Sequence, residues 1–128
     1  MLPEPEVGGR VNDFSGGLSS VQAVMDLYDE VEQEIEELKE HEYLTAEHER
    51  TYRMLVTQKT AAERMRGTPV TIVNNLVKGD EDVVDAFLAM ERARADAKAS
   101  SHIIFLKKDR IAMLTEVIKH DWYRPSNA

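Results

Sequence analysis

Apolar side chains recur at alternating spacings of three and four residues in the first third of the chain. The positions are Val21, Val24, Tyr28, Val31, Ile35 and Leu38. Most residues between them are acidic, amide or lysine side chains. Since residues at this spacing lie along one side of an α-helix, the pattern predicts an amphipathic helix. Its apolar seam must pack on another helix, in the same chain or in a second copy.

This first helix is expected to begin at Ser19 or Ser20, because a serine hydroxyl can cap the free amides of the first turn. It would end near Tyr43. Residues 44 and 45 predict a tight connection, after which Thr45 would cap a second helix over residues 46–66, ended by Gly67. The two helices would form an antiparallel hairpin. A single helix that continues through Thr45 is the alternative.

Thr68 and Pro69 predict a further helix, since a capping hydroxyl followed by proline is typical of a helix start. It would cover residues 70–78 and end at Gly79. The β-branched residues 70–73 could instead form a strand, but no second strand is available to pair with it.

The last helix is expected to open within residues 80–82 and to run to about His120, because no glycine or proline interrupts it. About 39 residues correspond to roughly 58 Å. A small globule cannot cover such a helix, so we expect sister subunits to pack along it. Its predicted inner line is Val83, Ala86, Phe87, Met90, Ala93, Ala97, Ser100, Ile104, Ile111, Leu114 and Ile118.

The predicted fold class is therefore all-α. An antiparallel helical hairpin is followed by a short helix and one long helix, in a coiled-coil-like homo-oligomer. Residues 19–122 would form one helical domain. Residues 1–18, which contain two prolines and four glycines, are expected to be a flexible N-terminal arm, and residues 123–128 a C-terminal tail.

Composition narrows the function classes. The chain has 128 residues and no cysteine, which excludes disulfides and thiolate metal sites. We find neither a signal-peptide pattern nor an apolar run long enough for a bilayer, so we expect a cytoplasmic protein that does not contact membranes.

The net charge of −8 is unevenly distributed. Residues 1–50 hold fourteen acidic and three basic residues, whereas residues 51–128 hold ten acidic and thirteen basic residues. Such an acidic chain is not typical of nucleic-acid-binding proteins. The asymmetry nevertheless permits a basic surface once the acidic helix is turned away.

The chain offers no catalytic constellation. Its histidines, His41, His48, His102 and His120, form neither a His-x3-His nor a Glu-x-x-His pair. The carboxylates form an exposed run without an apolar pocket, and no serine stands in a nucleophile elbow. We therefore expect no enzyme, no cofactor or metal, and no small-molecule substrate.

Basic residues recur along the second and last helices and suggest contacts with phosphates. The candidate nucleic-acid-binding residues are Lys59, Arg64, Arg66, Lys107, Lys108, Arg110, Lys119 and Trp122. Trp122 could stack on an unpaired base, and several copies would multiply the few phosphate contacts of one chain. Alternatively, these lysine and arginine side chains form ion pairs with acidic residues of the first helix or are solvated.

The order of parts resembles that of a known family. A mixed acidic helix is followed by residues 58–65 (QKTAAERM), a break at Gly67, and a long helix with residues 105–114 (FLKKDRIAML) and 117–119 (VIK). This layout over residues 30–120 resembles small helical phage proteins of the UvsY-like recombination-mediator type. The resemblance implies an oligomeric, non-enzymatic protein in a bacterial cytoplasm that binds single-stranded DNA. It would help to load a recombinase in place of the single-strand-binding protein.

Two functions are therefore expected. The first is an oligomeric accessory protein of DNA recombination whose basic residues bind single-stranded DNA. The second is a non-enzymatic protein-interaction factor without nucleic-acid binding, either an acidic DNA-mimic inhibitor or an assembly adaptor. The inhibitor would be favoured if the basic side chains were engaged in ion pairs and an open acidic surface remained at Glu30, Glu34, Glu37 and Glu40.

Overall fold

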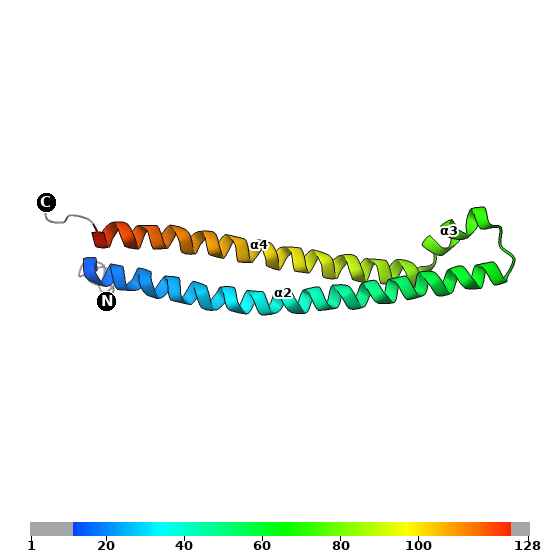
Figure 1. The fold of residues 1–128 in the computed structure, drawn as a ribbon, viewed down its shortest axis with the longest axis horizontal. Helices are drawn as coiled ribbons and strands as arrows, with labels where there is room; N and C mark the ends of the chain where they lie inside the picture. Colours follow the sequence, from blue (N-terminus) through cyan, green and yellow to red (C-terminus); the bar gives the residue numbers. More distant parts are fainter. Residues whose placement is uncertain (1–11, 124–128) are drawn as a thin grey trace, which may run out of the picture. The chain divides into compact units, whose positions relative to one another are not determined.

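The computed structural model describes the backbone of residues 12–123 and the side chains of residues 19–122. This part of the chain consists of three helices, α2 (Asn12–Met65), α3 (Val70–Lys78) and α4 (Glu81–Tyr123), and contains no strand (Figure 1). The all-α class is therefore confirmed. Residues 70–73, for which a strand was the alternative, belong to α3.

Helix α2 is continuous for 54 residues, so the predicted connection at residues 44 and 45 is wrong and the alternative of a single helix is correct. The hydroxyl of Thr45 donates a hydrogen bond to the carbonyl oxygen of His41 (2.8 Å). It therefore bonds back within the helix and caps nothing. No glycine or proline lies between Leu18 and Arg66 to interrupt the helix.

The ends of the long helices also differ from the expected ones. Helix α2 already begins at Asn12, so Ser19 and Ser20 lie inside it and not at its start. Of the predicted N-terminal arm, residues 1–11 lie outside the described residues. Helix α4 covers 43 residues and ends at Tyr123, three residues beyond the predicted end. The rest of the predicted tail, residues 124–128, is likewise outside the described part.

The connection between α2 and α3 turns at Gly67, as predicted. Its φ angle of 82° lies in the left-handed region, which glycine adopts without a steric penalty. The amide of Gly67 donates to the carbonyl of Arg64, and the amide of Thr68 to that of Glu63 (both 3.1 Å). Thr68 does not cap α3, because its hydroxyl donates to Oε1 of Glu63 (2.7 Å) and Pro69 is the N-cap residue.

Asp80 opens α4. Its Oδ1 atom accepts hydrogen bonds from the backbone amides of Asp82 (2.9 Å) and Val83 (3.3 Å). These amides have no partner within the helix, so the carboxylate supplies the missing acceptor and a favourable charge at the helix N-terminus.

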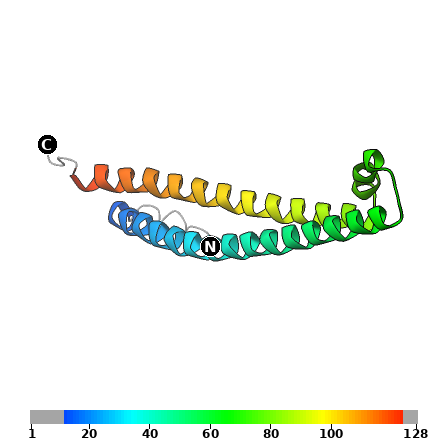
Figure 2. The ribbon, with the colours of Figure 1, turned by 45° about the vertical axis from the view of Figure 1, so that its right-hand side comes forward.

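The chain forms two compact units. Unit 1 combines residues up to Ile35 with residues from His102 onward, and unit 2 is Glu36–Ser101. Within each unit, segments of α2 and α4 lie side by side and run in opposite directions, as both views show (Figures 1 and 2). Unit 2 also contains α3.

The buried positions follow a spacing of three and four in both long helices, which is typical of coiled-coil packing. In unit 1 the seam of α4 is formed by Ile104, Lys107, Ile111, Leu114 and Ile118. The seam of α2 there includes Val24, Leu27, Val31 and Glu34. Two seam positions of unit 1 are therefore occupied by charged residues.

Unit 2 has a buried apolar cluster beside α3. Val73 and Val77 of α3 form a buried cluster with Val83 of α4. Tyr52, Leu55 and Val56 of α2 pack against it. Farther along the seam α2 presents the half-buried residues His41, Thr45 and His48, while α4 presents Ala93, Ala97 and Ser100. The seam of unit 2 thus changes from large apolar residues to small and polar ones.

All predicted seam residues lie buried or half-buried except Tyr28, whose place in the seam is taken by Leu27. On the predicted inner line of α4, Phe87 is likewise exposed, while Lys107 is half-buried there unexpectedly. In each unit α4 is flanked by α2. The argument that its length alone requires sister subunits is therefore wrong, because the uninterrupted α2 provides a partner within the chain.

Candidate functional site

Lys59, one of the predicted DNA-binding bases, is occupied by contacts inside unit 2. Its Nζ atom lies 3.3 Å from Oδ2 of Asp80 and 3.3 Å from Oδ2 of Asp82. The hydrogen bond to Asp80 is the main cause that raises the pKa of Lys59 above 10.5. Burial alone would raise the pKa of Asp80, but the bonds from the Val83 amide and Lys59 outweigh it and lower that pKa. This lysine ties α2 to the start of α4.

Lys107 has a comparable place in unit 1. Its side chain is 28% exposed, and its Nζ atom lies 3.1 Å from Oε1 of Glu30 and 4.0 Å from Oε2 of Glu34. Glu34 itself is only 14% exposed. Lys107 therefore connects the two helices of unit 1, and its charge is shared with two carboxylates of α2.

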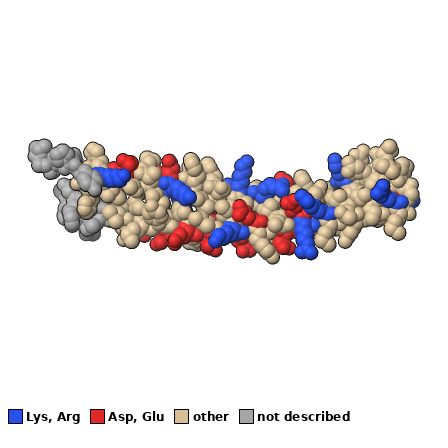
Figure 3. Space-filling view, in the orientation of Figure 1, with Lys and Arg blue, Asp and Glu red and all other residues tan. Residues whose placement is uncertain are grey.

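A basic group lies around α3 in unit 2. Arg64, Arg66 and Lys78 are exposed there, and Glu63 is the single acid within residues 61–79. Glu63 accepts from Arg66 (2.8 Å) and from Thr68. Arg64 forms no ion pair with any described residue. Acidic and basic side chains alternate along α2 and α4 in Figure 3, whereas the part that carries α3 shows only basic ones on this face.

Two of the remaining predicted basic residues lie with aromatic residues on one face of α4 in unit 1. Lys108, Lys119 and Trp122 are separated by eleven and three residues, which places them on the same side of the helix. Phe105 lies one turn before Lys108. Trp122 is 65% and Phe105 is 64% exposed. We call Lys108, Lys119, Trp122, Phe105 and the neighbouring Tyr28 of α2 the aromatic–basic face.

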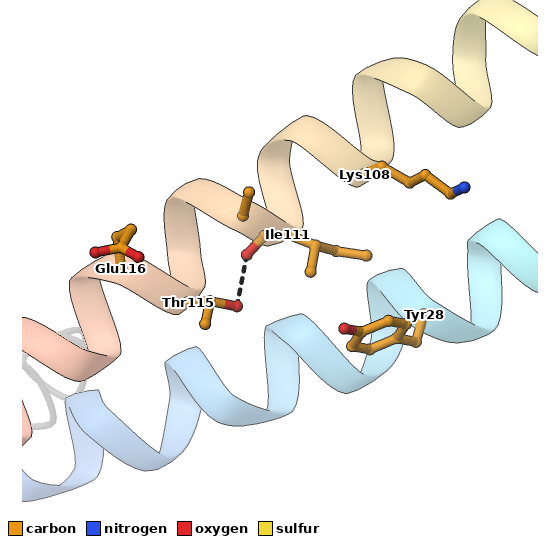
Figure 4. A pocket seen from close by; sticks show the side chains of 6 residues that line it. Tyr28, Lys108, Ile111, Thr115 and Glu116 are labelled. Atoms are coloured by element: carbon orange, nitrogen blue, oxygen red, sulfur yellow. Dashed lines mark hydrogen bonds between the residues drawn. The ribbon is translucent and has the colours of Figure 1, made fainter.

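An open groove of about 470 Å³ runs beside this face. Tyr28 lines it from α2, and Lys108, Ile111, Ala112, Thr115 and Glu116 line it from α4. Tyr28 is 57% exposed. In Figure 4 the side chains of Lys108 and Glu116 leave the groove in different directions, while the Thr115 hydroxyl donates to the carbonyl of Ile111 (2.7 Å). The polar groups do not converge on one point, so the groove offers contact area and no arrangement for acid–base chemistry.

Not every predicted base belongs to the aromatic–basic face. Arg110 follows Lys108 by two residues, which turns it by roughly 200° to another side of α4. Lys119 is on the face, but its Nζ atom lies 3.7 Å from Oε2 of Glu116. Such an exposed ion pair contributes little stability and opens readily. Of the predicted residues, Lys108, Lys119 and Trp122 thus lie along one side of α4 in unit 1.

Two aromatic residues of this face, Tyr28 and Phe105, were not predicted from the sequence as binding residues. Tyr28 fits the apolar seam by spacing, and only the continuous heptad that uses Leu27 shows that it points elsewhere. Phe105 was not selected at all. Its spacing of three from Lys108 is a signal that could have indicated a shared helix face.

The described side chains of residues 19–122 contain no cluster of three or more histidine or acidic residues able to hold a metal ion. Within residues 12–123 no helix has an apolar stretch suited to crossing a bilayer.

The fold defines an all-α protein with paired long helices, and its candidate site is an open surface. No protein-family model, curated protein or solved structure matches the chain.

Proposed function

We propose that this chain is a non-enzymatic, homo-oligomeric accessory protein of DNA recombination that binds single-stranded DNA. The aromatic–basic face supports the proposal, because exposed aromatic rings beside lysines suit a flexible strand. Phe105 and Trp122 can stack on bases, and Lys108 and Lys119 can contact phosphates. The geometry favours this face over the full set of predicted bases, since Lys59 and Lys107 are engaged by carboxylates.

One chain offers few phosphate contacts, and its net charge of −8 opposes the approach of DNA. An assembly of copies would engage several faces on one strand, and affinity rises steeply when contacts act together. The basic group around α3, with Arg64, Arg66 and Lys78, would add phosphate contacts from unit 2. The resemblance to recombination mediators suggests the remaining partners, a recombinase and a single-strand-binding protein, within a bacterial cytoplasm.

The proposal is tested by titration with an oligo(dT) strand. Trp122 is the only tryptophan, so its fluorescence reports directly on the face. We expect quenching at low salt and an affinity that falls with salt concentration. Lys108→Glu should weaken binding by about tenfold, since it reverses a charge on the face. Arg92→Glu, the same change at an exposed position of unit 2, serves as the control.

The proposal fails if the oligonucleotide does not bind at low salt, or if binding is insensitive to salt. Equal losses for Lys108→Glu and Arg92→Glu would indicate general electrostatic attraction and would remove the aromatic–basic face as the site.

A second function is favoured by the acidic residues of unit 2. Glu37 and Glu40 are exposed, although Glu30 and Glu34 of unit 1 contact Lys107. The acidic surface is therefore only partly open. It would suit a DNA-mimic inhibitor or an assembly adaptor that binds a basic protein. A chain that ignores oligo(dT) but competes with DNA for a positively charged DNA-binding protein would support this function.

A further inference from the structure

The aromatic–basic face has a regular order along α4. Phe105 precedes Lys108 by three residues, and Trp122 follows Lys119 by three residues. The two lysines therefore lie between two exposed aromatic rings. Since each residue turns the helix by about 100°, all four side chains leave α4 within an arc of roughly 100°. They form one line with a ring at each end.

The distances along this line are set by the helix, because all four residues belong to the uninterrupted α4. The rise per residue places the two rings about 25 Å apart along the axis and the two lysines about 16 Å apart. A strand with the spacing of B-DNA, about 3.4 Å per nucleotide, would need roughly eight nucleotides to reach from ring to ring, and an extended strand fewer. A trinucleotide is too short to reach both.

The surface between the two lysines can hold the middle of such a strand. The open groove lies there, between Lys108 and Glu116, and Tyr28 of α2 borders it with a third exposed ring. Of the described residues that line the groove, Glu116 is the single acid, and its carboxylate is paired with Lys119. Lys108 forms no ion pair with any described residue, so its charge is available to a phosphate.

We propose that a single unpaired strand lies lengthwise along α4 and contacts both ends of the aromatic–basic face at once. One base stacks on Phe105 and another on Trp122, while phosphates between them meet Lys108 and Lys119. The ligand is therefore a continuous stretch of single strand that is long enough to reach both rings, and not a mononucleotide or a very short oligonucleotide. This inference rests on the proposed function and specifies how its strand is held.

The fluorescence of Trp122 reports on one end of the face and can therefore test whether the other end holds the same strand. The probes are oligo(dT) of twelve nucleotides, which reaches both rings, and oligo(dT) of three nucleotides, which reaches only one. Phe105→Ala should weaken the twelve-nucleotide titration by at least about fivefold, because one stacked base is lost. It should leave the three-nucleotide titration unchanged. Phe105→Tyr, which keeps a ring, should restore the affinity for the longer strand.

Tyr43→Ala is the matched control, since Tyr43 is also an exposed aromatic residue (60%) but lies on α2 in unit 2. It should change neither titration. An unchanged twelve-nucleotide titration for Phe105→Ala overturns the inference, because the strand at Trp122 then does not reach Phe105. An equal loss for both strand lengths also overturns it, because Phe105 would then affect Trp122 through the protein and not through a shared strand.

The results also separate this inference from the proposed function. If the wild type and Phe105→Ala bind the longer strand equally well, the function stands and the lengthwise strand is lost. If the lengths and variants behave as expected but the chain does not assist a recombinase, the lengthwise strand stands and the role in recombination is lost. A wild-type chain that binds neither oligonucleotide at low salt overturns both.

Discussion

The Nζ atom of Lys107 lies 3.1 Å from Oε1 of Glu30, although residue 107 occupies a seam position of α4. Glu34, the second carboxylate at 4.0 Å, is itself a seam residue of α2. An ionic contact thus interrupts the apolar seam of unit 1. Charged residues at such positions restrict the registers in which two helices can pair, because any shift leaves half-buried charges without a partner.

Lys107→Glu should destabilise the protein. The change places a third carboxylate beside Glu30 and Glu34, both held near the seam, so repulsion replaces attraction. We expect the free energy of unfolding to fall by about 2 kcal/mol. Urea denaturation followed by circular dichroism measures the loss.

The adjacent variant Lys108→Glu provides the comparison, because it makes the same charge change at an exposed position. Its free energy of unfolding should stay within about 0.5 kcal/mol of the wild type. If both variants lost the same stability, the ionic contact at Lys107 would have no special structural role.

The contact of Lys59 with Asp80 should make stability depend on pH at both extremes. The pKa of Asp80 is lowered from 3.8, so its contribution is present above that value and is lost as the pH falls through the folded pKa. The pKa of Lys59 is raised from 10.5, so its contribution is present below that value and is lost as the pH rises through the folded pKa.

Asp80→Asn isolates this effect, since the amide oxygen can still cap α4 but carries no charge. The variant should be less stable than the wild type at neutral pH. The difference should shrink at an acidic pH below the lowered pKa of folded Asp80, where its carboxyl becomes protonated in the wild type too. Urea midpoints at the two pH values check this, and a constant difference would contradict the assignment.

Gly67→Ala should destabilise the connection between α2 and α3 by about 1 kcal/mol. Its φ angle of 82° is costly for a residue with a Cβ atom, although nothing lies within 4 Å of that position. Gly79→Ala is the control, because Gly79 has a helical φ of −92° and a new Cβ would make only ordinary contacts. Thermal unfolding should separate the two, and equal melting temperatures would refute the argument.

Local signals in the sequence predict much of the fold. Gly67, Gly79 and Asp80 have the expected places, and the uninterrupted stretch after Asp80 forms one helix. The connection at Thr45 fails because a threonine hydroxyl can either cap a helix or bond back to the carbonyl four residues earlier. Only the heptad that continues on both sides of Thr45 distinguishes these cases, and its polar members His41 and His48 conceal it.

The candidate site was less predictable. Charge identifies bases, but it does not show which bases face a carboxylate of another helix. The partners of Lys59 lie more than twenty residues away, and those of Lys107 lie more than seventy residues away. Such pairing depends on how the segments of α2 and α4 align within each unit, which charge alone does not reveal. The shared face of Lys108 and Lys119 depends on α4 alone, so it could be predicted from their spacing in the sequence.

The change of seam residues in unit 2 affects how that unit opens. Val73, Val77 and Val83 form a buried apolar cluster beside α3, whereas the stretch around His41 and Ala97 has little apolar volume to lose. Backbone amides near Thr45 should therefore exchange with deuterium sooner than those near Leu55. Local unfolding of unit 2 should therefore begin at the end away from α3, while the end that carries α3 stays folded longest.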